Sequence, residues 1–183
     1  MITSVFKKST PINLILVVIL ILVFFLIFQF QDLTWSNPVF LILKKTGLFV
    51  ILLGSVFMTN FVAKKNGLSK DSGYTIFFYF LFLLFFPSLF NNTNLIIANF
   101  FVLLALRRLI SLQTQKASKE KIFDASLWIF LASLFHFWSV LFILLVFISI
   151  IFHVYRDYRN WVIPFIAFFC SRDYFDAFID AFL

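Results

Sequence analysis

Two histidines are the side chains in this chain best suited to proton transfer or metal binding. His136 lies within the apolar stretch Phe135-His136-Phe137-Trp138, and His153 follows in the same stretch of sequence. On one straight α-helix the two rings would be about 25 Å apart, too far to share an ion. We therefore interpret His136 as a neutral histidine hydrogen-bonded to a neighbouring helix, with proton transfer as the alternative. No residue pattern predicts a metal site or a cofactor.

Two aspartates and a pair of arginines are the other ionisable candidates. Asp32 follows the first apolar stretch and is either a loop residue or a catalytic base facing outward. Asp124 is expected in the first turn of a helix, where an acid favours the helix dipole. It could also pair with Arg107 or Arg108. These arginines interrupt an apolar stretch, and we expect them to reach lipid or phosphate head groups.

Three asparagines and a face of small residues indicate packing between helices. Asn13, Asn60 and Asn99 lie in apolar surroundings, where interhelical hydrogen bonds are worth about 0.6 kcal/mol. A seven-residue spacing relates Ala125, Ala132 and Ser139. Small side chains on one helix face let another helix approach closely, either within the chain or from another membrane protein.

The composition is typical of a protein embedded in a lipid bilayer. Hydrophobic residues make up 63% of it and charged residues 13%, with 31 phenylalanines and a net charge of +7. A soluble domain has about 45–50% apolar and about 25% charged residues. The basic residues lie in short segments beside apolar stretches, which indicates membrane topology and contact with the lipid bilayer. Nucleic-acid binding is not predicted.

The apolar stretches predict an all-α fold: a single domain, residues 1–183, forming a polytopic transmembrane helical bundle. About 17–25 residues are needed to cross a bilayer. The expected spans cover about residues 12–30, 46–63, 74–90, 95–112 and 122–152, and a partial or interfacial sixth covers 161–170. The segment Val39–Leu43 is too short to cross and is expected to form an interfacial turn of helix ahead of the second span.

The fifth stretch is too long for one straight crossing, because a helix over residues 122–152 would measure about 46 Å. Strong tilt, protrusion from the lipid or a break near His136 would accommodate it. The excess of Lys and Arg in cytoplasmic loops predicts a cytoplasmic N-terminus. If the fifth stretch crosses once, residues 116–121 lie inside, whereas Arg156 and Arg159 lie outside, as do Lys44 and Lys45.

Several short motifs give the chain a family resemblance. They are Met1-Ile2-Thr3-Ser4-Val5-Phe6-Lys7, Leu106-Arg107-Arg108-Leu109, Lys121-Ile122-Phe123-Asp124-Ala125, Leu131-Ala132-Ser133-Leu134 and Tyr155-Arg156-Asp157-Tyr158-Arg159-Asn160-Trp161. The chain thereby resembles an uncharacterised family of multi-pass inner-membrane proteins from Gram-negative bacteria, which implies a location in the bacterial inner membrane. Some members carry the label of carotene-cleaving oxygenases. Such enzymes bind iron through a set of histidines larger than the two present here.

These features suggest an accessory or structural component of an envelope assembly or transport complex. One alternative is a membrane glycosyltransferase-like enzyme acting on lipid-linked sugars, with Asp32 as the base and the arginine pair on a phosphate. Another is a transporter of small solutes or ions that uses His136.

Overall fold

The computed structural model describes residues 11–30, 38–67, 73–154 and 157–182, and this part of the chain is helical without any strand. The predicted all-α fold class is therefore confirmed. The chain divides into two structural units, residues 1–100 and residues 101–183. The division falls inside one helix, α6 (Thr93–Ile110), which contributes to both units.

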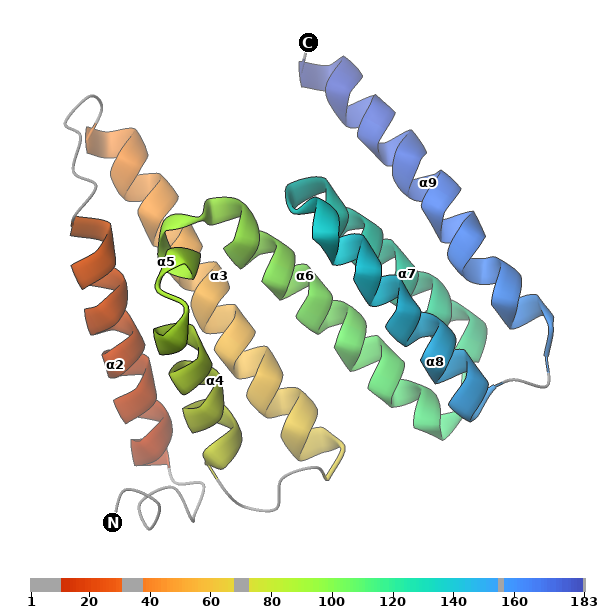
Figure 1. The fold of residues 1–183 in the computed structure, drawn as a ribbon, viewed down its shortest axis with the longest axis horizontal. Helices are drawn as coiled ribbons and strands as arrows, with labels where there is room; N and C mark the ends of the chain where they lie inside the picture. The colour runs from red at the N-terminus through yellow and green to blue at the C-terminus, as the bar shows by residue number, and fades with distance from the viewer. Residues whose placement is uncertain (1–10, 31–37, 68–72, 155–156, 183) are drawn as a thin grey trace. The chain divides into compact units, whose positions relative to one another are not determined.

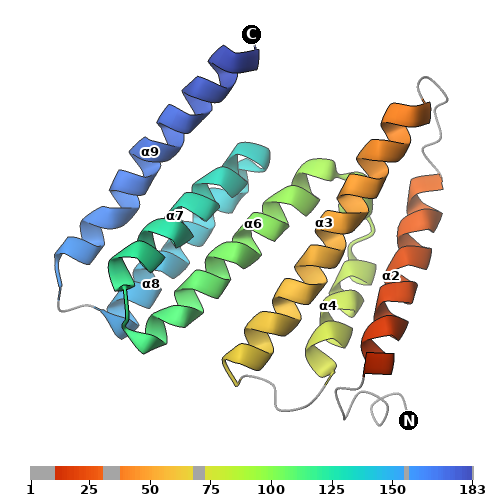
Figure 2. The same cartoon turned by 180° about the vertical axis from the view of Figure 1, so that it is seen from behind.

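Unit 1 packs α2 (Pro11–Phe30) against α3 (Pro38–Lys65) and α4 (Tyr74–Phe85), with the short α5 (Ser88–Asn91) beside α2. Figures 1 and 2 show these helices side by side. Each long helix buries apolar side chains spaced three or four residues apart, the spacing of one helix face. The buried side chains of the three helices are Val17, Ile21, Phe25, Leu48, Leu52, Val56, Ile76, Phe80 and Leu83.

Prolines mark two helix boundaries in unit 1. Helix α3 is continuous from Pro38 to Lys65, so the helical turn expected at Val39–Leu43 is present and joins directly to the predicted span over residues 46–63. Proline fits the first helical turn because its missing N–H is not needed there. Helix α4 ends at Phe85 rather than near residue 90. Pro87 disfavours helical backbone at Phe86, whose φ of -123° and ψ of 71° lie outside the helical region.

Unit 2 contains the rest of α6, the short 3₁₀ helix η1 (Ser111–Thr114) and α7 (Ser118–Phe135). Then follow η2 (Phe137–Phe142), α8 (Ile143–His153) and α9 (Arg159–Phe182). Helix α7 contacts both α8 and α9, and α8 also contacts α9. Figures 1 and 2 show these three helices next to one another. The unit's buried core consists of Ala105, Leu109, Leu112, Ile122, Ala125, Ile129, Val146, Ile150 and Ile163.

The fifth predicted stretch is broken at His136, one of the three solutions that its length allowed. The backbone of His136 is extended, with φ -144° and ψ 106°, and it separates α7 from η2. Just before the break, the Ser133 hydroxyl donates to the Phe130 carbonyl 2.7 Å away, a local bond that competes with the helical ladder. Helix α8 then returns alongside α7, so residues 122–152 form a helical hairpin (Figure 1).

The C-terminal helix is longer than its sequence predicts. The expected apolar segment 161–170 lies within α9, which continues to Phe182. Pro164 stands inside this helix and is almost fully buried. Because proline has no N–H, the carbonyl of Asn160 loses its usual helical donor.

Two helical stretches of the described chain are long and apolar enough to cross a membrane, Ile42–Lys65 and Thr93–Thr114. The apolar helices Ile12–Phe28, Tyr74–Phe85 and Phe137–His153 are shorter. The bundle of five spans therefore stays a prediction.

The glycines of α3 provide a test of how α3 packs on α6. A Cβ added to Gly54 would lie 3.2 Å from the Phe100 ring, whereas one added to Gly47 would meet nothing within 4 Å. Gly54→Leu is therefore expected to lower stability by about 1–3 kcal/mol through overpacking. Gly47→Leu is the matched control and should leave stability unchanged or slightly raised. Thermal unfolding in detergent, followed by circular dichroism, measures both; equal effects of the two variants would contradict the packing.

Candidate functional site

Nine described charged residues of unit 2 lie toward one end of its helices, which we call the basic end. It comprises the C-terminal part of α6, the turn into α7, the end of α8 and the start of α9. The Gln115 side-chain amide donates to the His153 carbonyl at 3.2 Å. The Lys119 Nζ atom lies 3.5 Å from Asp157 Oδ2. These two contacts join the turn before α7 to the junction between α8 and α9.

Basic side chains outnumber acidic ones at the basic end. The basic ones described are Arg107, Arg108, Lys116, Lys119, Lys121 and Arg159, and the acidic ones are Glu120, Asp124 and Asp157. The contact between Lys119 and Asp157 corrects one sequence prediction. Residues 116–121 and Arg159 were expected on opposite membrane faces, but the α7–α8 hairpin returns the chain to the same end.

The predicted pairing of Asp124 with the arginines of α6 is confirmed for Arg108. Its Nη2 lies 2.9 Å from Asp124 Oδ2, with both side chains partly exposed. The contact links the end of α6 to the second turn of α7. Arg107 is exposed one residue earlier. The ion pair offsets the positive charge of Arg108 at the end of a helix that is mostly apolar.

Lys121 holds the turn between α6 and α7 closed. Its Nζ donates to the Ser111 carbonyl and to Thr114 Oγ1, each at 2.8 Å. The turn itself has left-handed backbone at two residues that are not glycine, Gln115 with φ 51° and Ala117 with φ 49°. The sequence does not predict this geometry, because neither residue type favours it.

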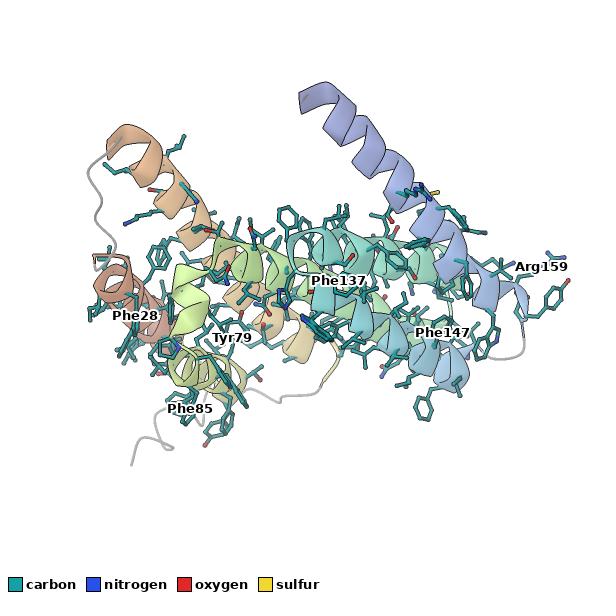
Figure 3. The ribbon with its side chains drawn as sticks, turned by 45° about the horizontal axis from the view of Figure 1, so that its top comes forward. Phe28, Tyr79, Phe85, Phe137, Phe147 and Arg159 are labelled. Carbon is teal, nitrogen blue, oxygen red and sulfur yellow. The ribbon has the colours of Figure 1, made fainter. Side chains whose placement is uncertain are left out.

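Unit 1 contains a polar contact between two apolar helices. Asn99 on α6 donates through Nδ2 to the Tyr79 hydroxyl on α4 at 2.7 Å. Figure 3 shows Tyr79 among the helices of this unit. The interhelical hydrogen bond predicted for Asn99 is confirmed. Asn13 is buried in α2.

Two buried amide oxygens lack a hydrogen-bond partner within the described residues. One is Oδ1 of Asn60 on α3, whose predicted interhelical bond is therefore not found for this atom. The other is Oδ1 of Asn160, a fully buried residue whose Nδ2 donates to the Val154 carbonyl at 3.2 Å. The sequence analysis missed Asn160, because it lies between polar residues that resemble an ordinary loop.

The two histidines do not come together as a site. His136 lies at the tip of the α7–α8 hairpin and His153 at the end of α8, next to the basic end. His153 Nδ1 lies 3.1 Å from the Ser149 carbonyl of its own helix. No hydrogen bond of the His136 ring is found within the part of the chain that is described, so its predicted bond to a neighbouring helix is not found. The described residues hold no group of metal-ligating side chains.

The small-residue face of the fifth stretch is buried inside unit 2. Ala125 and Ala132 are fully buried and Ser139 is 4% exposed. Helix α9 packs against α7, with Ala167 of α9 also fully buried. The predicted close approach of another helix therefore occurs within the chain. Asp32, the candidate catalytic base, lies outside the described residues.

No protein-family model, curated protein or solved structure matches this chain. Its function must therefore be inferred from its own residues and geometry.

The ion pair between Arg108 and Asp124 can be measured by a double-mutant cycle with Arg108→Gln and Asp124→Asn. Because the two side chains are 48% and 36% exposed, the coupling energy should be about 0.5–1 kcal/mol, as for exposed pairs. Chemical unfolding in mixed micelles measures it, and the coupling should fall at high salt. Strictly additive single effects would contradict a direct pairing.

The left-handed backbone of Ala117 gives a second test. Ala117→Gly should raise stability by about 0.5–1 kcal/mol, because glycine adopts positive φ without a Cβ clash. Ala105→Gly, in the buried interior of α6, is the control and should lower stability by a similar amount or more. Unfolding midpoints under the same conditions compare the two, and a loss of stability in Ala117→Gly would contradict the turn geometry.

Proposed function

We propose that this chain is an integral membrane protein, a bundle of helices in the bacterial inner membrane, and an accessory or structural component of an envelope assembly or transport complex. The observation that carries the proposal is that many large apolar side chains point outward from the helices. Helices with buried faces also present large apolar side chains outward, as on α8, where Leu144 is 58% and Phe152 is 77% exposed. A helix that is apolar all round is suited to lipid or to a protein partner in lipid.

The polar contacts support a structural role for the polar residues. Arg108 with Asp124, Lys119 with Asp157, and Asn99 with Tyr79 each join two different segments of the chain. In hydrocarbon, polar groups that bond across helices hold a bundle together. These residues are thus used for assembly of the bundle, which agrees with a protein whose role is to be a rigid membrane component.

The α7–α8 hairpin supports a topology with one crossing more than the sequence predicts. In this topology Arg159 lies on the same membrane face as Lys116, and the excess of positive charge on this face favours a cytoplasmic location for it. This arrangement agrees with a cytoplasmic N-terminus. The tip of the hairpin, with Phe137 and Trp138 exposed, lies at the opposite end of the unit.

Cysteine labelling tests this topology. In a Cys170→Ser background, single cysteines replace Lys116, Phe137 or Arg159 and are treated with a membrane-impermeant maleimide in oriented membrane vesicles. Lys116→Cys and Arg159→Cys should react from the same side, and Phe137→Cys from the other. Labelling of the first two from opposite sides would contradict the hairpin topology.

The size of the native complex tests the role as a component of an assembly. The chain has a mass of 21.5 kDa, so membership of a complex should give a discrete larger species after extraction in mild detergent. Blue-native electrophoresis followed by mass spectrometry should identify partners in fixed stoichiometry. A chain that stays monomeric in every mild detergent, or that turns over a substrate alone, would rule out this role.

A further inference from the structure

The basic side chains at the basic end differ in whether they have a partner within the protein. Arg108 and Lys119 each face a carboxylate, and Lys121 donates to oxygens of the turn. Lys116 and Arg159 are exposed, and neither side chain forms an ion pair with a carboxylate among the described residues, although the Arg159 backbone N–H donates to Asp157 Oδ1 at 3.3 Å. These two residues therefore present positive charge outward.

The fold brings these two cations to the same edge. Lys116 follows Gln115, whose side chain bonds to His153, and Arg159 follows Asp157, which contacts Lys119. Figure 3 shows Arg159 pointing away from the helices at this end of unit 2. The two cations are far apart in sequence, and the α7–α8 hairpin brings them to the same end of unit 2.

The surroundings of Arg159 are those of a membrane interface. Its guanidinium lies 5.9 Å from the centroid of the Tyr158 ring, and Tyr158 is 74% exposed. Trp161 follows on α9 and is also exposed, as are the next residue, Val162, and Phe165 one turn beyond Trp161. Tyrosine and tryptophan favour the level of the lipid head groups, and the apolar side chains beyond them suit acyl chains.

We propose that Lys116 and Arg159 bind the phosphate head groups of anionic phospholipids, with Tyr158 and Trp161 at the same depth. The proposal rests on the membrane location proposed above. It differs from the expectation for Arg107 and Arg108, because Arg108 is already paired with Asp124. The apolar flank of α9 favours a lipid over free phosphate, since only a lipid supplies an acyl chain to cover it.

A fluorescence experiment on the full chain tests the proposal. Of the four tryptophans, Trp35, Trp128 and Trp138 are replaced by phenylalanine, which leaves Trp161 as a local probe. The chain is reconstituted in phosphatidylcholine vesicles that contain an equal fraction of brominated phosphatidylglycerol or brominated phosphatidylcholine. Quenching of Trp161 should show an association constant at least about fivefold higher for phosphatidylglycerol, the effect expected for one basic residue near a charged surface.

Variants and salts separate this site from general attraction. Lys116→Gln with Arg159→Gln should remove the preference, whereas Lys116→Arg with Arg159→Lys should keep it. Lys44→Gln with Lys64→Gln, in unit 1, makes the same charge change and should leave the preference for phosphatidylglycerol intact.

Three results would contradict the proposal. Equal quenching by both lipids overturns it, as does a preference for phosphatidylglycerol that survives Lys116→Gln with Arg159→Gln. Loss of the preference in inorganic phosphate, compared with chloride at equal ionic strength, assigns the site to free phosphate instead. Failure of the chain to float with the vesicles overturns the membrane location itself.

Discussion

Unit 2 depends on the closure between the turn before α7 and the junction of α8 with α9. The bond from Gln115 to the His153 carbonyl and the contact of Lys119 with Asp157 fix the two ends of the α7–α8 hairpin together. Beside this closure the apolar faces of α7 and α8 meet, and Ile122, Ile129 and Val146 are buried between the helices of the unit. Helix α9 starts from the same end and covers the remaining face of α7.

The pairing of polar side chains in this chain is the pattern expected if lipid hydrocarbon surrounds its helices, as we propose. In water, an exposed ion pair contributes at most about 1 kcal/mol, and an exposed lysine needs no partner. Near hydrocarbon, an unbonded polar group is costly, and polar side chains are bonded in pairs. Asn99 with Tyr79 and Lys121 with Thr114 follow this rule. The unpartnered oxygens of Asn60 and Asn160 are exceptions within the described part of the chain.

The sequence predicts the existence of the helices better than it predicts how they connect. Long apolar stretches identify α2, α3 and α6, because their length and composition require regular hydrogen bonding. The pairing of Asp124 was also predictable, since both partners lie beside the same short loop. The break at His136 was one of three alternatives, because no glycine or proline marks it. The contact of Lys119 with Asp157 was missed, because it depends on that break, and reading 122–152 as one crossing sends the two residues to opposite faces.

For the membrane location that we propose, the hairpin has a further consequence for how the chain would be inserted. Its tip, from Ser133 to Ser139, carries no charge other than that which His136 can acquire, whereas both of its ends carry Lys, Arg and Asp. A charged residue at the bilayer centre costs about 2.5–3.5 kcal/mol on insertion scales, so translocation of the tip is cheap and translocation of the ends is not. The two helices can thus be inserted together as a preformed loop, with the charged ends retained on the side of synthesis.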